Sequence, residues 1–517
     1  MTDIAGELIA ARKRRRGDPI RTRLPRTFAR HNANAPLEPA STERPVPAQT
    51  PSATRWFALI VLLAGAFLPP VDFFIVNVSL ASIRADLGAS PGQSQLVISG
   101  YAACYAVFLI TGGRLGDLFG RRKMFLLGMA GFTIANLACG LAGTPQELLA
   151  ARAIQGVSAA LLVPQVLGAV RALCVDEKDL ARAMSAYGVM MGLAAAIGQF
   201  AGGALVQWSP FGLGWRTVFL LKLPFCAAVM VSSWLLVPET GGMGKARLDL
   251  TGAALVSLAL AGVIVPLSEG RDRGWPLWIF LLLAAVPVLI VVFLRHEKRL
   301  AAQGGSPLVD LRLFAIPSFR RGVLVATLFF FTTSFYLLFG LYQQEGRGAD
   351  PLHTGLAIVP YGIGLFVGPL VTAPLVRLRD RLLAIGMAIQ VAGYAGIGIL
   401  VAIDAPPAAL LASVLLAGFG QGIAFPRLYN TVLGQVPAAS AGVAAGIVNS
   451  SLQVGASIST AAIGSLFFSI LASGDGASGH GERAYAHAFA IAQGTLTAAL
   501  FVAMLIAIPR WTARTAP

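Results

Sequence analysis

One acidic residue lies inside the first long apolar stretch of this chain. The segment AFLPPVDFFIVNV, residues 66–78, places Asp72 in a run, 57–78, that is otherwise almost entirely apolar. A charged side chain at the centre of a membrane-spanning helix costs roughly 2.5–3.5 kcal/mol, and Pro69 and Pro70 each remove a backbone donor from the helix. An ionisable group kept at that cost indicates a function such as proton exchange. The alternative is a structural acid whose charge one basic partner neutralises.

Two basic residues in other apolar stretches are predicted to lie at a similar depth. At about 1.5 Å of helix rise per residue, Asp72 lies roughly 6 Å, Arg152 roughly 10 Å and Lys222 roughly 5–6 Å outward from the middle of its span. Asp72 and Arg152 can therefore meet. We hypothesise that Asp72 exchanges a proton and that Arg152 tunes this exchange, because burial disfavours an ionised carboxyl whereas a nearby cation favours it.

The orientation of Lys222 has two alternatives. We expect it to point inward, where it adds a cation near Asp72 and favours anionic or zwitterionic cargo; pointing outward, it would extend its charge toward the membrane surface. That outward orientation is the expected one for Arg427, near the inner end of a later apolar stretch. All five histidines lie outside the interiors of the apolar stretches, which leaves the carboxylate as the titrating group.

The composition places these residues in a membrane protein. Of the 517 residues, 56% are hydrophobic and 12% are charged, whereas soluble domains have about 45–50% apolar and about 25% charged residues. A spanning helix needs about 20 mostly apolar residues. Because the seventh run is short, twelve or thirteen spans are alternatives to fourteen. The fourteen runs lie near residues 57–79, 93–113, 124–143, 148–170, 182–206, 215–236, 250–267, 276–294, 322–343, 354–376, 382–402, 407–430, 441–471 and 487–508.

The net charge of +16 is distributed as a membrane topology signal. Loops after even-numbered spans hold 18 Lys and Arg residues, and loops after odd-numbered spans hold 6, which is the bias expected of cytoplasmic loops. We therefore predict a multi-pass protein of the cell (inner) membrane with both termini in the cytoplasm. The same placement argues against nucleic acid as a partner, since the basic residues follow the loops instead of forming one patch.

The chain divides into two predicted bundles with flanking segments. Residues 1–55 are basic, rich in Pro and Ala and without an apolar core, so we expect a disordered cytoplasmic tail; contact with anionic lipid head groups is the alternative. A weak echo of the loop GGRLGDLFGRRK (112–123) in APLVRLRDRLL (373–383) suggests related halves, as in many transporters. We predict bundles at 56–240 and 318–510, a two-helix insert with its cytoplasmic connection at 241–317, and a cytoplasmic tail at 511–517.

Five segments resemble signatures of the major facilitator superfamily. GGRLGDLFGRRK is similar to its loop signature, LLAARAIQGVSAA (148–160) to its fourth-span signature and GQFAGG (198–203) to its fifth-span antiporter signature. VDFFIVNVSL and GWRTVFLLKLP resemble motifs of the fourteen-span drug:proton antiporter branch, except that Lys222 replaces the usual Asn. The resemblance runs from about Trp56 to Trp511. It implies an all-α membrane protein with the major facilitator fold, two six-helix bundles plus two extra transmembrane helices, about 14 spans in all.

The resemblance also assigns roles to the loop and to the fifth span. In the family, the loop latches the two bundles in the outward-facing state through charge and helix-dipole contacts; the matching residues are Gly113, Asp117, Gly120, Arg121 and Arg122, while Leu118 stands where Arg is frequent. Anchoring by positive charge alone would explain the basic residues, but not Asp117 or the glycine spacing.

The fifth span has small residues at helical spacing, which allow close approach of helix backbones. It lacks the signature's proline, which is Gln199 here, and its glycines at 185 and 194, which are Ser185 and Ala194. The proline kink is therefore not expected, whereas close packing is. The predicted packing positions are Gly188, Gly192, Gly198, Gln199, Gly202 and Gly203.

Uncharged polar residues inside other spans are candidates for lining a substrate cavity. Polar groups facing lipid would be costly, so side chains such as Asn449 and Gln453 are expected to face a cavity or another helix. An apolar chamber with a few such groups suits varied amphipathic compounds. The candidates for cavity or substrate contact are Gln155, Lys222, Tyr336, Gln343, Asn449 and Gln453.

These features predict a proton-coupled antiporter that exports lipophilic or amphipathic small molecules by alternating access; the export direction comes from the family resemblance. The alternatives are a proton-coupled transporter of one specific metabolite and, more remotely, a membrane sensor without transport. The chain has no GxxxxGK[ST] phosphate loop, no HExxH and no clustered Cys/His site, so we expect no enzyme, cofactor or metal site. The expected partners are a small-molecule substrate, protons and the lipid bilayer, and the expected state is a monomer.

Overall fold

The computed structural model describes residues 52–174, 176–240, 249–270, 272–305, 307–372, 381–434, 436, 441–473 and 481–507, and these ranges contain helices but no strand. The predictions for residues 1–51 and 511–517 fall outside the described residues, as does most of the echo loop at 373–383.

The first bundle contains the spans before the insert. Its helices are α2 (Ser52–Leu87), α3 (Pro91–Phe119), α4 (Arg121–Leu141), α5 (Pro145–Leu173), α6 (Glu177–Trp208), α7 (Thr217–Leu220) and α8 (Lys222–Leu236), with the short turns η1 (Pro210–Gly212) and η2 (Gly214–Arg216) before α7. The insert consists of α9 (Leu250–Glu269) and α10 (Leu277–Ala302), and the turn η3 (Leu311–Ala315) lies in the connection that follows.

The second bundle begins with an interrupted span. That span consists of α11 (Pro317–Phe329), the 3-10 turn η4 (Phe330–Thr332), α12 (Thr333–Leu341) and the π-helical turn η5 (Tyr342–Gly346). The remaining helices are α13 (Pro351–Thr372), α14 (Leu382–Ala402), α15 (Pro407–Leu433), α16 (Ala441–Ser473) and α17 (Glu482–Ala507).

Fourteen of these helical segments are long and apolar enough to cross a membrane, including the short seventh run. The protein is therefore a multi-pass membrane protein with the fourteen spans that the sequence predicts. An even number of crossings returns the chain to the side of the membrane on which α2 begins. Helix α2 is continuous through Pro69 and Pro70, which lack the N–H groups that would otherwise bond the carbonyls one turn earlier.

Local sequence signals set several helix starts. Ser90 forms a capping box with Gln93 at the start of α3, and the Thr144 hydroxyl accepts a hydrogen bond from the Glu147 amide at the start of α5. The Asp249 carboxylate accepts from the Gly252 amide at the start of α9. Each cap satisfies an amide that has no partner within the helix.

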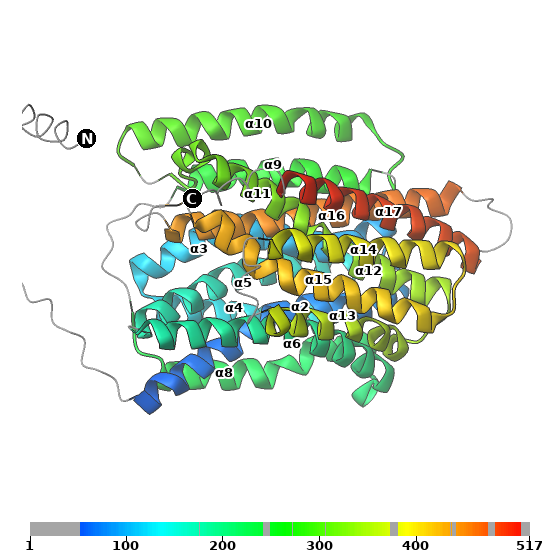
Figure 1. Ribbon diagram of the computed structural model, residues 1–517, viewed down its shortest axis with the longest axis horizontal. Helices are drawn as coiled ribbons and strands as arrows, with labels where there is room; N and C mark the ends of the chain where they lie inside the picture. Colours follow the sequence, from blue (N-terminus) through cyan, green and yellow to red (C-terminus); the bar gives the residue numbers. More distant parts are fainter. Residues whose placement is uncertain are drawn as a thin grey trace, which may run out of the picture. The chain divides into compact units, whose positions relative to one another are not determined.

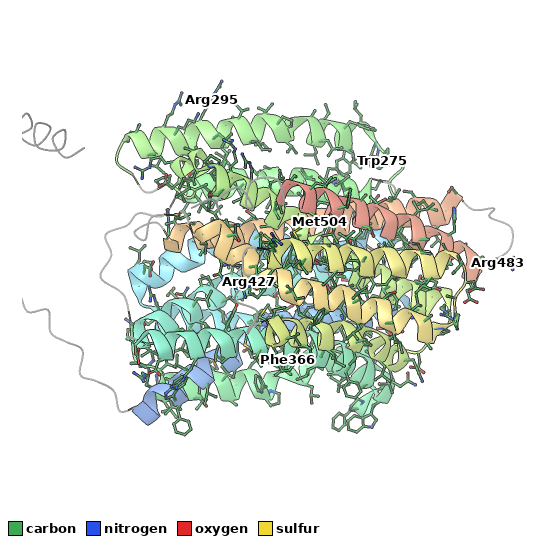
Figure 2. All side chains as sticks on the ribbon, viewed as in Figure 1. Trp275, Arg295, Phe366, Arg427, Arg483 and Met504 are labelled. Atoms are coloured by element: carbon green, nitrogen blue, oxygen red, sulfur yellow. The ribbon has the colours of Figure 1, made fainter. Side chains whose placement is uncertain are left out.

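Helix α10 extends beyond the predicted eighth span. The apolar run was placed at 276–294, but the helix continues to Ala302, because Glu, Lys, Arg and Ala are good helix formers. His296 and Glu297, expected in a connection, are therefore helical. Only 17% of the most apolar window of α10 is buried inside the protein, and Figure 1 shows α10 outermost, next to α9. Arg295 lies on the face of α10 that points away from α9 (Figure 2).

Three pairs of helices provide much of the contact between the bundles: α6 with α13, α3 with α16, and α2 with α12. The small residues of α6 allow close packing against two different helices, α2 and α13. Added Cβ atoms at Gly198 and Gly202 would come within 2.8 Å of Phe74 Cβ and 2.9 Å of the Ile75 carbonyl oxygen, both on α2. At Gly203 a Cβ would lie 2.3 Å from the Pro351 carbonyl oxygen at the start of α13.

Two other positions of α6, Gly192 and Gln199, also pack against α13. A Cβ at Gly192 would meet the Phe366 backbone of α13 at 3.3 Å, and the Gln199 carbonyl oxygen lies 2.5 Å from a Cβ built at Gly355 of α13. The surroundings of Gly188 lie outside the described residues. Close packing of α6 thus fixes α2 on one side and contacts the second bundle on the other.

We predict that Gly202→Ala lowers the free energy of unfolding by about 1–3 kcal/mol, the usual cost of inserting an atom into packed helices. The added methyl group would press against the α2 backbone at Ile75. Thermal unfolding of the detergent-purified protein measures the effect. Gly494→Ala in α17 is the matched control, because nothing lies within 4 Å of its added Cβ; it should stabilise the helix by about 0.5–1 kcal/mol. Equal stability of the Gly202→Ala variant and the wild type would contradict the packing argument.

Candidate functional site

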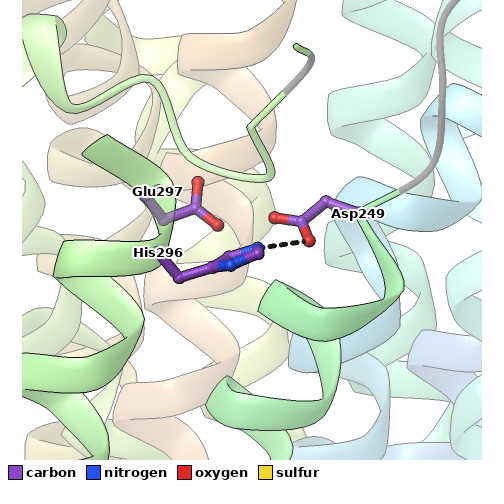
Figure 3. Close-up of side chains that lie close together, drawn as sticks. All are labelled: Asp249, His296 and Glu297. Carbon is purple, nitrogen blue, oxygen red and sulfur yellow. Dashed lines mark hydrogen bonds and ion pairs between the residues drawn. The ribbon is translucent and has the colours of Figure 1, made fainter. Parts of the chain in front are cut away.

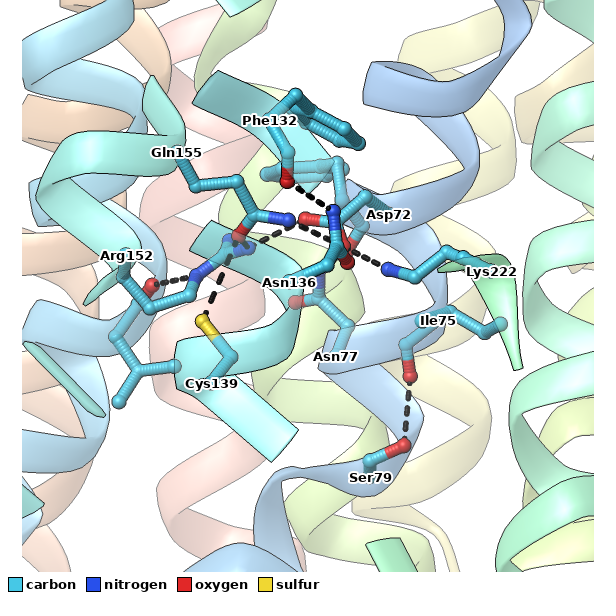
Figure 4. Close-up of polar contacts among 12 residues, drawn as sticks. Asp72, Ile75, Asn77, Ser79, Phe132, Asn136, Cys139, Arg152, Gln155 and Lys222 are labelled. Carbon is cyan, nitrogen blue, oxygen red and sulfur yellow. Dashed lines mark hydrogen bonds and ion pairs between the residues drawn. The ribbon is translucent and has the colours of Figure 1, made fainter. Parts of the chain in front are cut away.

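The candidate site is a buried cluster of charged side chains in the first bundle. Asp72 comes from α2, Arg152 from α5 and Lys222 from the start of α8, and their exposed fractions are 0%, 1% and 8%. Figure 4 shows the three side chains converging from separate helices. The contact of Asp72 with Arg152 that the depth comparison allows is present, and Lys222 points inward.

Each oxygen of the Asp72 carboxylate accepts hydrogen bonds from this cluster. Arg152 Nη1 donates to Oδ2 and Lys222 Nζ donates to Oδ1. Gln155, one turn after Arg152 on α5, donates from Nε2 to Oδ1 at 3.0 Å and accepts from Arg152 Nη1 at 2.5 Å. The structure therefore places Gln155, a cavity candidate from the sequence, in direct contact with the charged groups.

Three neighbours that were not predicted from the sequence hold the cations in position. Arg152 Nε donates to the Val97 carbonyl oxygen at 3.0 Å, and the guanidinium lies 4.2 Å from the centre of the Tyr101 ring on α3. Lys222 Nζ lies 5.0 Å from the centre of the Phe219 ring. Cation–π contact of this kind is stronger in a desolvated site. A polar aromatic residue inside a span was the only available signal for Tyr101.

Two asparagines lie beside the cluster (Figure 4). Asn77 and Asn136 each donate a hydrogen bond to the carbonyl one turn earlier in their own helices, α2 and α4. Their buried Oδ1 atoms and Arg152 Nη2 have no hydrogen-bond partner among the described residues. Leaving a buried donor or acceptor without a hydrogen-bond partner costs free energy. The cluster therefore retains both donor and acceptor capacity for another polar group.

The formal charges of the cluster do not cancel. One carboxylate faces a guanidinium and an ammonium, which leaves one excess positive charge when all three are ionised. A buried charge without a full counter-charge is unfavourable unless hydrogen bonds or a ligand compensate. The arrangement favours the approach of an anionic group and makes protonation of Asp72 costly, since a proton would weaken two ion pairs at once.

An aromatic contact joins the cluster's helix to the second bundle. Phe74, two residues after Asp72, packs edge-on against Tyr336 of α12 with ring centres 5.0 Å apart. Tyr336 in turn packs against Tyr361 of α13, whose hydroxyl accepts from Tyr394 at 2.9 Å. Tyr336 is thus buried in an aromatic group between the bundles and contacts the charged site's helix through Phe74.

The remaining cavity candidates lie apart from the charged cluster. Gln343 is buried in the π-helical turn η5. Asn449 of α16 accepts a hydrogen bond from the Tyr429 hydroxyl of α15, and Gln453 lies one turn further along α16 and is partly exposed. Among the described contacts, none joins these three residues to Asp72. Arg427 of α15 is also partly exposed and lies near the end of its helix (Figure 2).

The predicted latch residues have described contacts within the first bundle. Asp117 pairs with Arg121 at 2.9 Å, and Arg121 Nη1 donates to the Gly168 carbonyl oxygen at 2.5 Å. Arg122 donates from its guanidinium to the Trp234 carbonyl oxygen and from its amide to Glu239 at 3.0 Å.

Two glycines shape the same loop. Gly120 adopts φ +103° between α3 and α4, a conformation that favours glycine, and a Cβ there would meet the Glu239 carboxylate at 2.7 Å. Gly113 has more room, since its Cβ would lie 3.6 Å from Pro164. Glu239, which was not predicted from the sequence, accepts hydrogen bonds from the amides of Arg122 and Lys123 in the first turn of α4.

Comparison with solved structures shows the fold. The chain superimposes on the crystal structure of tetrameric PepTSo2 with a TM-score of 0.63 at 15% sequence identity, covering 88% of this chain and 98% of that one. It superimposes on a bacterial homologue of the human lysosomal transporter Spinster, in an inward-facing and unoccupied conformation, with a TM-score of 0.61 at 16% identity, covering 89% and 97%.

Comparison of sequences identifies the family. The pattern that defines the Major Facilitator Superfamily matches residues 62–460. A probable actinorhodin transporter of Streptomyces coelicolor is 36% identical over 82% of this chain and 74% of its own length. Puromycin resistance protein pur8 of Streptomyces alboniger is 34% identical (80% and 82%), and cephamycin export protein CmcT of Amycolatopsis lactamdurans is 30% identical (84% and 88%). The chain is a transporter of the major facilitator superfamily and not an enzyme, with the fourteen spans and antibiotic-exporting relatives of the drug:proton antiporter branch.

Proposed function

We propose that this transporter is a proton-coupled antiporter that exports lipophilic or amphipathic small molecules from the cell by alternating access. The observation that carries the proposal is the buried carboxylate of Asp72, held between two cations in a chain whose relatives export antibiotics. Transporters of this architecture bind cargo and coupling ions near the middle of the membrane, between the repeats.

In this proposal, proton exchange occurs because a proton competes with Arg152 and Lys222 for the carboxylate of Asp72. In the described conformation both oxygens of Asp72 accept from cations. A conformation or a cargo that draws Arg152 or Lys222 away would leave the carboxylate in an apolar surrounding, where taking up a proton becomes favourable. Return of the cations would then expel the proton. This cycle links protonation to the position of helices α2, α5 and α8.

Contacts at one end of the bundles support alternating access. Arg84, near the end of α2, pairs with Glu345 of η5 at 2.9 Å, and the Tyr485 hydroxyl donates to the same carboxylate at 2.8 Å. Gln344 donates to the Val78 carbonyl oxygen of α2 at 2.8 Å. These contacts join the bundles at the end predicted to face outward. At the opposite end the Asp117 side chain is 61% exposed, in keeping with a disengaged latch.

The excess positive charge of the cluster points to cargo with an anionic or zwitterionic part. An amphipathic molecule with one acidic group would supply the missing counter-charge to Arg152 and Lys222, while aromatic side chains such as Phe74 and Tyr336 contact its apolar part. Actinorhodin and cephamycin, the compounds in the names of two relatives, are the first compounds to screen.

We predict that combined Asp72→Asn and Lys222→Asn substitution abolishes proton coupling without removing the fold. Asp72→Asn alone would leave two buried cations without a counter-charge, and breaking a buried pair in this way costs about 3–5 kcal/mol. The double variant has the same formal charge of +1 as the wild-type cluster but lacks the carboxyl group. In proteoliposomes, cargo-driven proton movement should vanish, whereas downhill cargo exchange continues.

The control for this experiment is Lys222→Asn, which keeps the pair of Asp72 with Arg152. It should retain coupling, because the carboxyl group that is proposed to exchange the proton is still present beside Arg152. Cargo for the assay comes from a growth screen of overexpressing cells against antibiotics, which also distinguishes a broad exporter from a transporter of one metabolite. Undiminished coupling in the double variant would refute the role of Asp72.

We predict that Glu345→Gln makes opening of the outward side easier. The substitution removes a partly exposed ion pair worth about 0.5–1 kcal/mol. The reporter is Cys139, which is buried beside Gln155. Its reaction with an impermeant maleimide added outside cells should become about two- to fivefold faster. The other three cysteines are replaced by Ala. Glu482→Gln is the control, because its pair with Arg347 at 3.3 Å lies within the second bundle. Identical rates in both variants would exclude Glu345 as an outer gate.

A further inference from the structure

A second cluster of ionisable side chains lies outside the transport site, where the two helices of the insert meet. Asp249 caps the start of α9, and His296 and Glu297 lie together near the end of α10. His296 Nε2 is 2.8 Å from Asp249 Oδ1, and one ligand atom from each of the three residues lies within 4.8 Å of the other two. Figure 3 shows the three side chains pointing toward one another from opposite sides of a narrow gap.

Each carboxylate in this cluster has one oxygen bonded to a backbone amide and one oxygen without a partner. Asp249 Oδ1 accepts from the Gly252 amide, and Glu297 Oε2 accepts from the Val309 amide, both at 2.8 Å. Asp249 Oδ2 and Glu297 Oε1 are buried and have no hydrogen-bond partner among the described residues. Glu297 is 0% exposed and Asp249 is 8% exposed.

The two unpartnered oxygens point at the same place. A Cβ built on Gly252 would lie 2.3 Å from Asp249 Oδ2 and 2.5 Å from Glu297 Oε1, so both oxygens converge on the first turn of α9. Leaving two buried anionic oxygens unpaired side by side is costly. Either a proton shared between the carboxyl groups or a bound cation relieves that cost.

We propose that Asp249, His296 and Glu297 bind a divalent transition metal of the Zn²⁺ type. Two carboxylate oxygens and one imidazole nitrogen are ligands that this class of ion accepts, with solvent in a fourth position. Bonds of about 2.0–2.2 Å in tetrahedral geometry place ligand atoms roughly 3.3–3.6 Å apart, a spacing that the three ligand atoms, all within 4.8 Å of one another, reach with small side-chain shifts. The partly exposed imidazole gives the ion a route from solvent.

A bound cation would also balance the charge of the two carboxylates. When both are ionised they carry two negative charges, and Arg114 of α3, which donates to the Pro307 carbonyl oxygen, supplies one positive charge in their field. One negative charge remains when His296 is neutral, as a metal ligand must be. A bound ion would fasten α9 to α10 and, through Val309, to the connection that leads into the second bundle. This role is independent of proton coupling.

The test is Zn²⁺ binding to the full-length protein in detergent, purified without a histidine tag and stripped with a chelator. Isothermal titration should give one saturable site per chain, and X-ray absorption spectroscopy should show one imidazole and light oxygen ligands at about 2.0–2.2 Å. His296→Ala and Glu297→Gln should each weaken binding by about tenfold or more, since losing a ligand costs at least as much as losing its supporting contact. Wild-type protein should also unfold at a higher temperature with Zn²⁺, and the His296→Ala variant should not.

The matched control is His353→Ala, because His353 makes a similar 2.7 Å contact with Asp350 but is exposed and lacks a third ligand. It should bind Zn²⁺ as the wild type does. If Glu297→Gln does not fold, His296→Ala decides the outcome, since its side chain is partly exposed. Two results would overturn the proposal. If the wild type shows no saturable Zn²⁺ binding, the two carboxyl groups share a proton instead. If the His296→Ala variant binds Zn²⁺ as tightly as the wild type, His296 is not a ligand.

Discussion

The pairing of Asp72 with Arg152 and Lys222 is the interaction on which the rest of the first bundle depends. Inside a membrane protein an unpaired charge is far costlier than in water, so three helices must bring their charged groups to one point and keep them there. Arg152 reaches this point because Val97 and Tyr101 hold its guanidinium. Lys222 reaches it because the sixth span is interrupted directly before it, between α7 and α8.

Close helix packing supplies the precision that this pairing requires. Gly198 and Gly202 let α6 lie against α2 on both sides of Asp72, at Val71 before it and at Phe74 and Ile75 after it. The same helix meets α13 through Gly203 and Gly192. A displacement of the second bundle therefore reaches α2 through α6 as well as through the contact of Phe74 with Tyr336. These contacts physically connect motion of the second bundle to the helix that carries Asp72.

The interrupted ninth span and the insert add features that a plain bundle lacks. The π-helical turn η5 presents Gln344 and Glu345 to α2, and π-helical turns frequently occur at functional sites. Helices α9 and α10 form a separate layer in which α9 contacts α3 and α16, while most of the apolar window of α10 is not buried by the protein. The carboxylates of Asp249 and Glu297 at their junction are among the buried polar groups of that layer.

The sequence by itself determined the positions of the apolar runs, the predicted depth of the charged residues and the family signatures, whereas the helix at the short seventh run settled the number of spans as fourteen. Hydropathy and helix rise are properties of neighbouring residues, so fourteen apolar runs and the similar depths of Asp72 and Arg152 can be read directly from the order of residues. Departures such as Lys222 and Gln199 were visible in the same way, since they replace expected residues within recognisable motifs. The breaks at Leu221 in the sixth span and at Phe330–Thr332 in the ninth were not visible, because neither contains the glycine or proline that signals an interrupted helix.

Only the tertiary structure decided which atoms meet. Lys222 had two physically acceptable orientations, and the carboxylate of Asp72 on another helix selects the inward one. Gln155 belongs to the charged cluster and Asn449 does not, although both are amides inside apolar spans. Asp249 and His296 are separated by two helices in the chain and meet only because α9 and α10 pack side by side. Such contacts depend on the rotation and register of whole helices, which hydropathy leaves free.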